Sequence, residues 1–384
     1  MPRVRVMLSC GEPSGDLYAG ALAAEILRLE PDAIVSGFGG ERMQAGGATL
    51  LRDFRGLSVT GLTEALRVIP RSWQAYRALV RAADAEPPDV FVPIDFVDFN
   101  AFLARALHRR GVPVVYYISP QLWAWRRGRI KTVKRVADRM LVIFPFEVPF
   151  YEEAGVPVTF VGHPLLELTP PAAPRDAFLR RHGLDPARPV VAILPGSRSN
   201  ELREILPGLV AAAGVIAHRV PDAQFLIGRA PHLADDLFAP LGGWPAGAGR
   251  PVLLQQATDD ILANADVALV ASGTVTVQAA LHTCPMVVVY RVAPMTYRLG
   301  KPLVQVDTYA MVNLVAGRRL VPELIQDDFT PEATARHALA VLTDPAYAAR
   351  VRTDLAAVRA SLGTAGASRR AAEAILDVAR QRTR

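Results

Sequence analysis

Short, nearly continuous runs of apolar residues alternate with amphipathic segments along most of this chain, and this alternation restricts its fold more than any other feature. Apolar runs without a polar residue at every second position are typical of strands buried on both faces, as in parallel sheets covered by helices. The pattern therefore predicts an α/β fold with mainly parallel sheets. We expect strands at residues 4–9, 33–38, 90–94, 114–118, 140–143, 158–161, 190–194, 224–227, 252–254, 267–271 and 286–290, with helices between them, such as 17–29, 73–85 and 100–109.

A proline-rich stretch at residues 163–174 interrupts the alternation, which starts again at residue 190. Clustered prolines between two periodic regions are typical of a linker, and 384 residues are enough for two domains. We expect two Rossmann-like domains, at residues 1–165 and 175–345, that face each other across a cleft. Residues 346–384 are rich in Ala, Arg and Leu and should form C-terminal helices.

The net charge of +6 favours an anionic partner, although scattered arginines explain that charge equally well. The two cysteines are too few for a disulfide framework, and the seven histidines show no metal-binding spacing, so no metal site is expected. The apolar run at the N-terminus is too short for a signal peptide, and the polar residues within 267–290 argue against a membrane span. We therefore expect a cytoplasmic protein that touches a membrane without crossing it.

Ligands of doubly wound sheets bind beyond the carboxyl ends of the strands, so the segments after the predicted strands hold the candidate site. The segment 10–16 lacks the glycine pattern of a dinucleotide fold, and no phosphate-loop motif occurs, which argues against a bound cofactor. Ser14 and Asp16 suit a helix cap, with Gly15 allowing a tight turn. The functional alternative is that Glu12 and nearby backbone amides face the cleft.

The segment 93–100 places two carboxylates, Asp95 and Asp98, directly after an apolar strand. One of them can cap the following helix, but two together with Asn100, interleaved with Phe96 and Phe99, exceed what capping needs. A carboxylate in apolar surroundings has a raised pKa and can act as a base near neutral pH. This segment is therefore a candidate for the catalytic base.

Two segments mix aromatic or aliphatic residues with cations. Residues 118–135 contain two tryptophans followed by a basic run, and residues 67–81 carry a weaker mixture of the same kind. A buried tryptophan before a solvated basic helix explains the first segment without any ligand. The combination of apolar and basic residues otherwise favours an anionic lipid surface, and no nucleic-acid-binding motif accompanies it.

Two further segments start helices of the second half with small residues. Gly196 and Ser197 precede Arg198, a bidentate phosphate donor, and the segment 271–276 contains a second turn of small residues. Each segment alone can simply cap a helix. Together, at strand ends of one domain, they predict a diphosphate site.

Several motifs in this order resemble the lipid-A-disaccharide synthases, a family of inverting glycosyltransferases with the GT-B fold. The similarity covers nearly the whole chain. The motifs that carry it lie at residues 11–16, 88–95, 98–100, 119–125, 144–147, 162–164, 194–198, 271–274 and 313–318.

The resemblance implies transfer of a sugar from UDP-2,3-diacylglucosamine to 2,3-diacylglucosamine 1-phosphate, which gives the β-1,6-linked disaccharide phosphate of lipid A biosynthesis and UDP. Neither a cofactor nor a metal is implied. The position of Asp98 is the candidate base, and Glu12, Arg198 and Asn313 belong to the functional set. In this interpretation the acceptor-side residues are Glu12, Ser14, Gly15, Asp16, Asp95 and Asn100, and the donor-side residues are Gly196, Ser197, Arg198, Ser272, Gly273, Thr274, Gln278 and Asn313.

The acyl chains of both substrates imply peripheral contact with the anionic inner membrane, and no nucleic acid. Three positions depart from the family pattern: Gln278 replaces a ribose-binding Glu, Val97 replaces a Pro, and Glu167 replaces an Asp. The alternatives are another UDP-sugar enzyme of this fold, either an epimerase or a different glycosyltransferase, and a non-catalytic protein that binds lipid or nucleic acid.

Overall fold

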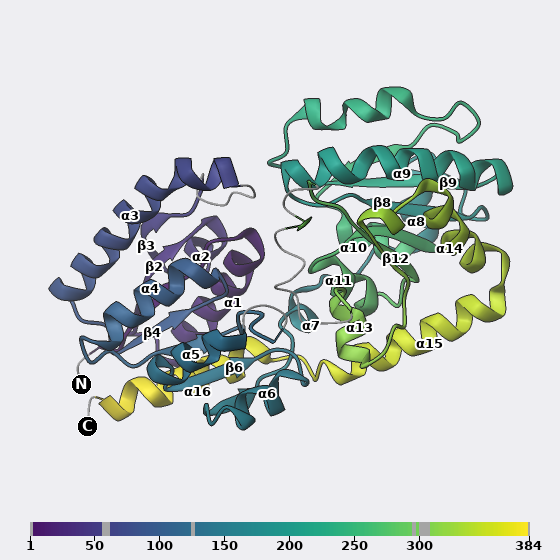
Figure 1. The fold of residues 1–384 in the computed structure, drawn as a ribbon. Coiled ribbons are helices and arrows are strands. Elements are labelled where there is room, and N and C mark those ends of the chain that lie inside the picture. The colour runs from purple at the N-terminus through teal and green to yellow at the C-terminus, as the bar shows by residue number, and fades with distance from the viewer. Residues whose placement is uncertain (1–2, 56–61, 124–126, 294–296, 299–307, 383–384) are drawn as a thin grey trace. The chain divides into compact units, whose positions relative to one another are not determined.

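The computed structural model describes residues 3–55, 62–123, 127–293, 297–298 and 308–382 and divides the chain into two compact units (Figure 1). Unit 1 consists of Met1–Glu167 and Leu362–Arg384, and unit 2 consists of Leu168–Ser361. Each unit is an α/β domain built on parallel strands, as the apolar runs predict.

Unit 1 contains one four-stranded and one three-stranded parallel sheet. The first runs in the order β3-β2-β1-β4 and the second in the order β5-β6-β7. Two parallel bridges, Phe91 to Val114 and Ile94 to Tyr117, connect β4 with β5. The strands are β1 (Arg5–Ser9), β2 (Ile34–Gly39), β3 (Thr49–Asp53), β4 (Val90–Pro93), β5 (Val115–Tyr117), β6 (Arg139–Val142) and β7 (Val158–Phe160).

Helices follow most of these strands, because parallel neighbours need a crossover connection. Helix α3 begins at Leu62, eleven residues before the expected start of that helix. The helices of unit 1 are α1 (Pro13–Leu29), α2 (Glu41–Ala45), α3 (Leu62–Ala85), α4 (Val97–His108), η1 (Arg127–Arg129), α5 (Ile130–Val136), α6 (Glu147–Glu153) and α16 (Ala367–Arg382), with α7 (Leu165–Leu168) at the unit boundary.

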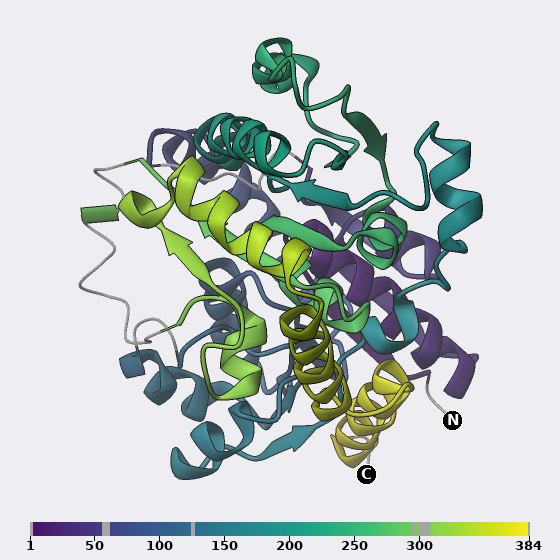
Figure 2. The same cartoon turned by 90° about the vertical axis from the view of Figure 1, so that its right-hand side faces the viewer.

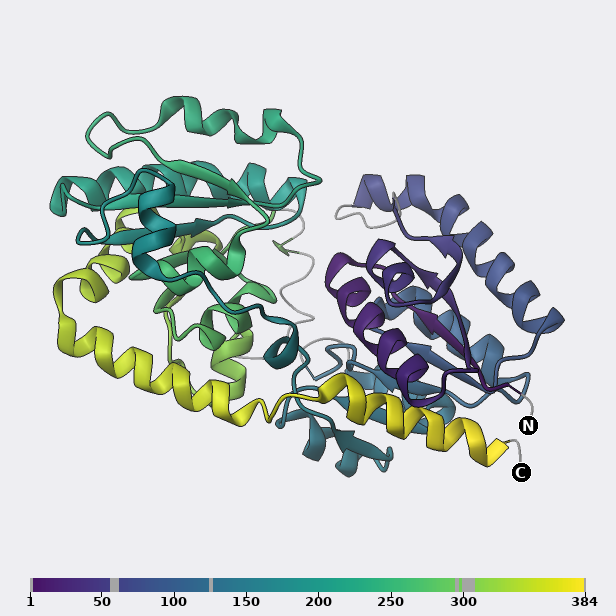
Figure 3. The same cartoon turned by 180° about the vertical axis from the view of Figure 1, so that it is seen from behind.

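Residues 346–384 contain two helices, as expected, but the two helices belong to different units. Helix α15 (Pro345–Ser361) belongs to unit 2, whereas α16 packs against α1 in unit 1 (Figure 3). The Glu167 carboxylate accepts hydrogen bonds from the amides of Gly366 and Ser368 and so caps the start of α16. Glu167, which departs from the family pattern, thus fixes the return of the chain to unit 1.

Unit 2 has a six-stranded parallel sheet in the order β10-β9-β8-β11-β12-β13, which is the strand order of a Rossmann fold. The strands are β8 (Val190–Leu194), β9 (Gln224–Arg229), β10 (Val252–Gln255), β11 (Val267–Ala271), β12 (Met286–Tyr290) and β13 (Glu323–Ile325). The helices are α8 (Arg175–Arg181), α9 (Ser199–Arg219), η2 (Asp235–Gly243), α10 (Thr258–Asn264), α11 (Val275–Leu281), α13 (Met311–Ala316), η4 (Gln326–Asp328), α14 (Pro331–Thr343) and α15.

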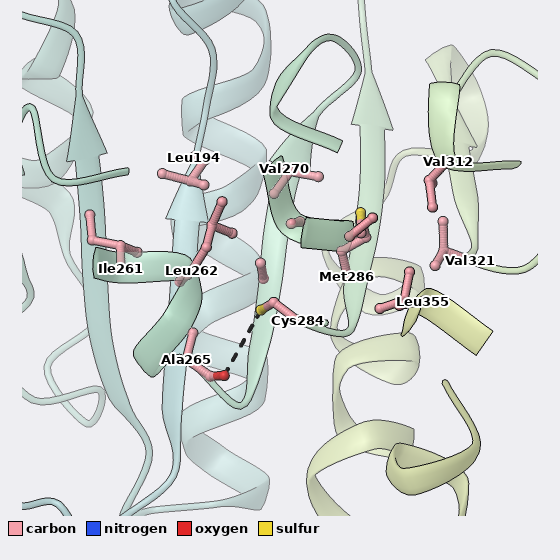
Figure 4. Packing of buried hydrophobic residues seen from close by; sticks show 14 of the residues in the cluster. Leu194, Ile261, Leu262, Ala265, Val270, Cys284, Met286, Val312, Val321 and Leu355 are labelled. Carbon is pink, nitrogen blue, oxygen red and sulfur yellow. Dashed lines mark hydrogen bonds between the residues drawn. The ribbon is translucent and has the colours of Figure 1, made fainter. Parts of the chain in front are cut away.

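Successive residues of β8 enter two different cores, which explains why this strand is apolar throughout. Val191 and Ile193 belong to a core cluster that includes residues of α9 and α14, two helices that pack against each other (Figure 2). Val190, Ala192 and Leu194 belong to the cluster on the opposite face (Figure 4). Cys284 lies in that second cluster as a buried free thiol.

Candidate active site

The order of the strands reverses between β1 and β4 in unit 1 and between β8 and β11 in unit 2. Ligands of such sheets bind at this reversal, beyond the carboxyl ends of the two central strands. Most of the candidate residues lie in the four segments that follow these strands. Each unit therefore has its own candidate site at the carboxyl ends of its central strands, where the sequence predicts it.

The reversal in unit 1 is held by Asn100, whose side chain is completely buried. Its Oδ1 accepts a hydrogen bond from the Ser9 hydroxyl at 2.6 Å, and its Nδ2 donates to the carbonyls of Ser9, Ile94 and Asp95 at 3.1, 3.3 and 2.7 Å. Asp95 and Phe96 have φ angles of 46° and 50°, in the left-handed region that non-glycine residues rarely adopt. Asn100 thus stabilises a strained turn between β4 and α4.

Aromatic packing fixes the other side of this turn. The Phe96 ring covers Gly11, where a Cβ atom would lie only 2.3 Å from a ring carbon. The rings of Phe96 and Phe99 also pack against each other and against Phe38, with centroids 5.0–6.2 Å apart. Gly11 is therefore required by close contact, and Phe99 points into the core.

Asp98 lies in the first turn of α4 with 73% of its side chain exposed, and its Oδ1 lies 2.7 Å from Nη1 of Arg129. The expectation of a carboxylate in apolar surroundings is therefore wrong for Asp98. Sequence reasoning also missed Arg129 as a partner, although Arg129 belongs to the basic run that it interpreted as a lipid-binding segment. The structure presents Asp98 as an accessible carboxylate oriented by a cation.

The side chains expected to cap α1, those of Ser14 and Asp16, do not form its N-cap. Asp16 does not cap its own helix; its buried carboxylate accepts hydrogen bonds from the amides of Gly40, Arg42 and Met43 and so anchors the start of α2. Glu12 occupies the N-cap position of α1, without a side-chain capping bond, and Ser14 lies in the first turn. A Cβ atom on Gly15 would lie only 3.2 Å from the Cβ atom of Cys10. The absence of a side chain at Gly15 therefore allows α1 to pack closely against the end of β1.

In unit 2, the segment after β8 depends on Glu201, a buried residue that sequence reasoning missed. The Glu201 carboxylate accepts hydrogen bonds from the backbone amides of Ser197 at 2.9 Å and Arg198 at 3.2 Å, and from the Arg198 guanidinium at 2.8 Å. Gly196 has a φ angle of 120°, and a Cβ atom there would collide with this carboxylate. Because these two amides bind Glu201, they are not available to a diphosphate, and the Arg198 side chain remains the candidate phosphate ligand of this segment.

The segment after β11 is the more open of the two. Gly273 and Thr274 are exposed, Ser272 is half-buried, and a Cβ atom on Gly273 would meet no other atom. Four residues after Thr274, in α11, Gln278 is half-buried and its Nε2 lies 3.4 Å from Asp259 Oδ1. The same carboxylate oxygen lies 2.9 Å from Nε2 of His282.

Asn313 has no capacity left for a nucleotide. Its Oδ1 accepts hydrogen bonds from the amides of Leu320 and Val321, and its Nδ2 donates to the Val321 carbonyl and the Glu323 carboxylate. These four bonds use both lone pairs and both amide hydrogens. Asn313 is thus a buried residue that orders the segment before β13, not a direct ligand as the resemblance implies.

Two titratable side chains that follow β6 and β7 in the chain, Glu147 and His163, are buried in unit 1. Burial raises the pKa of Glu147 to about 7, although its carboxylate accepts hydrogen bonds from Trp123 Nε1 and the Phe144 amide. Burial also lowers the pKa of His163 to about 3, and its Nδ1 accepts a hydrogen bond from the Leu165 amide. Trp123 is buried, whereas Trp125, the second tryptophan of the motif, lies outside the described residues.

Comparison with known proteins identifies the family. A family model described as lipid-A-disaccharide synthetase matches residues 6–377. The chain belongs to the lipid-A-disaccharide synthase family. The lipid-A-disaccharide synthase of Geobacter sulfurreducens is 45% identical over 97% of both chains, and that of Myxococcus xanthus is 42% identical over 97% of both chains.

Solved structures of similar fold include enzymes outside this family. A putative UDP-N-acetylglucosamine 2-epimerase from Listeria monocytogenes has a TM-score of 0.66 and 16% identity, covering 99% of this chain and 98% of its own. The calicheamicin glycosyltransferase CalG4 has a TM-score of 0.62 and 16% identity over 99% of both chains. These similarities establish for this family member the GT-B fold that glycosyltransferases and epimerases share.

The buried carboxyl of Glu147 predicts a specific pH dependence of stability for this family member. In the unfolded chain the pKa of Glu147 has its ordinary value of 4.5, whereas in the folded protein the carboxyl stays protonated up to about pH 7. The stabilisation that Glu147 gives the folded protein is therefore fully present below pH 4.5 and is lost as the pH rises through 7. This loss lowers the free energy of unfolding by about 3 kcal/mol, at 1.36 kcal/mol per pKa unit.

Substitution Glu147→Gln removes this dependence, so the variant should gain stability relative to the wild type between pH 4.5 and 8. Urea unfolding of both proteins across this range measures the difference. His163 destabilises both proteins alike as the pH falls below 6.5, so its effect cancels in the comparison. A difference between the two proteins that stays constant with pH would contradict the prediction.

Proposed function

We propose that this chain is a UDP-sugar-dependent glycosyltransferase that transfers 2,3-diacylglucosamine from its UDP derivative to 2,3-diacylglucosamine 1-phosphate. Membership of the lipid-A-disaccharide synthase family over residues 6–377 is the observation that carries this proposal. The geometry agrees with it, because each unit has polar residues at its own strand reversal. In this proposal unit 1 binds the acceptor and unit 2 binds UDP.

The reaction requires one base. The acceptor hydroxyl oxygen attacks the anomeric carbon of the donor, the bond from that carbon to the diphosphate oxygen breaks, and UDP leaves with both electrons. The hydroxyl proton passes to the carboxylate of Asp98. Its exposure and its contact with Arg129 support this role, because an accessible, oriented carboxylate can reach a substrate hydroxyl.

The leaving diphosphate develops negative charge as the bond breaks. Arg198 is the candidate group to stabilise this charge, since the buried Glu201 holds its guanidinium at the start of α9. The segment of Ser272, Gly273 and Thr274, in which the last two residues are exposed, lies at the neighbouring strand end and can contact the same phosphates. Gln278 lies one helical turn further, where its amide can bind the ribose hydroxyls.

Substitution of Asp98 by Asn tests the base directly. Asn keeps the size of the side chain but cannot accept the proton, so kcat should fall about 10²–10⁴-fold. The affinity for UDP should change little, because the proposed donor residues belong to unit 2. Turnover and UDP binding of the purified variant measure the two effects.

Asp95→Asn is the matched control, because Asn tolerates the left-handed conformation of residue 95 as well as Asp does. It should affect mainly folding or positioning, so its loss of turnover should be much smaller than that of Asp98→Asn. Near-normal turnover of Asp98→Asn would refute the assignment, and a large loss of UDP binding would show that Asp98 supports the structure instead.

Helix α3 supports peripheral association with an anionic membrane surface at the cytoplasmic side of the inner membrane. Among the described residues, no helix is both long and apolar enough to cross a bilayer. Ile69 and Trp73 are nevertheless 57% and 52% exposed, and the guanidinium of Arg77 lies 5.2 Å from the Trp73 ring centroid. Apolar side chains beside cations suit the boundary between acyl chains and headgroups.

Trp73→Ser should therefore reduce sedimentation with vesicles of phosphatidylcholine and phosphatidylglycerol, at least several-fold at low salt. Leu253→Ser is the control, since Leu253 is an exposed apolar residue of unit 2. High salt should weaken binding of the wild type, because salt screens the arginines of α3. Equal binding to neutral and anionic vesicles, insensitive to salt and to Trp73→Ser, would contradict peripheral electrostatic association.

A further inference from the structure

Phe102 is the most exposed large apolar side chain of the described residues, at 62%. A single exposed apolar residue is common and means little by itself. The position of Phe102 is more informative. It lies four residues after Asp98 and three before Arg105 on α4, so the three side chains share one face of the helix. The opposite face of α4 is buried through Leu103, Ala104 and Leu107.

Two contacts connect this face of α4 to η1 and α5, which lie beside it (Figure 1). Near the start of α4, Asp98 binds Arg129. Two turns later, Nη2 of Arg105 donates a hydrogen bond to the Thr132 hydroxyl at 3.2 Å, while its guanidinium lies 6.0 Å from the Phe102 ring centroid. Phe102 lies between these contacts along the helix, and neither neighbouring helix covers its ring.

The surroundings of Phe102 are strongly basic. Helix α5 adds the exposed side chains of Lys131, Lys134 and Arg135 to Arg105 and Arg129. Within the sequences of α4, η1 and α5 the only carboxylate is that of Asp98. An apolar side chain amid cations is complementary to a molecule that combines an apolar chain with a phosphate.

We propose that Phe102 binds an acyl chain of the phosphorylated acceptor, with Arg105 and the cations of α5 attracting the acceptor's phosphate. The inference rests on the proposed function, because it places the reacting hydroxyl at Asp98. The acyl groups and that hydroxyl belong to one sugar, so an acyl chain begins close to the base. Phe102 lies about one helical turn from Asp98, roughly 6 Å along the axis, where that chain can reach it.

The test uses the full-length protein in non-ionic detergent micelles, with UDP release as the readout. Phe102→Ala should lower kcat/KM for the long-chain acceptor about tenfold and leave kcat/KM for an acceptor with acetyl groups unchanged. The KM for the donor should stay the same. Phe102→Leu should restore most of the loss, because an apolar side chain is retained. Leu253→Ala, an exposed apolar substitution in unit 2, should behave like the wild type.

The outcomes separate the alternatives. Unchanged acceptor kinetics in Phe102→Ala would overturn the inference, and so would a defect in vesicle binding without a defect in micelles, which would assign Phe102 to the bilayer surface. An equal loss with long-chain and acetylated acceptors would also overturn it, because the effect would not depend on the chain. If the wild type releases no UDP with both substrates, the proposed function itself fails, which is a different result from an active wild type with a normal Phe102→Ala variant.

Discussion

The buried amide of Asn100 holds the part of unit 1 on which the proposed chemistry depends. It binds the end of β1 and the end of β4 and stabilises the left-handed turn at Asp95 and Phe96. That turn sets where α4 begins and thus where Asp98 lies. Loss of one buried hydrogen bond typically costs about 1–3 kcal/mol, and Asn100 makes four. The position of the base is therefore a consequence of a buried polar residue that itself contacts no solvent.

In unit 2, a buried acidic side chain likewise orders the segment between a strand and the following helix. Glu201, in the first turn of α9, binds the two preceding backbone amides and the Arg198 guanidinium. In α11, the Thr276 hydroxyl donates to the Gly273 carbonyl of the preceding turn. In each case a side chain at the start of a helix orders the loop that the preceding strand leaves. Rigid scaffolding of this kind lets exposed loop residues keep a defined geometry.

The sequence was sufficient to predict the parallel α/β architecture, because strands buried on both faces are apolar throughout. It did not predict β3, an edge strand whose residues are all exposed or half-buried, nor β13, which has only three residues. It placed most candidate residues in the segments after the strands but misjudged several side chains. Asp16 binds amides 24–27 residues away, and the pairing of Asp98 with Arg129 spans 31 residues, so local patterns could not reveal either contact.

The central claim is that this chain joins two acylated sugars, and analysis of its products tests this most directly. The purified protein is incubated with UDP-2,3-diacylglucosamine and 2,3-diacylglucosamine 1-phosphate, and the products are identified by mass spectrometry and proton NMR. We expect equal amounts of UDP and a β-1,6-linked disaccharide phosphate, and formation of neither product when the acceptor is omitted. UDP release that does not require the acceptor, or a UDP-sugar product with inverted configuration at carbon 2, would contradict it.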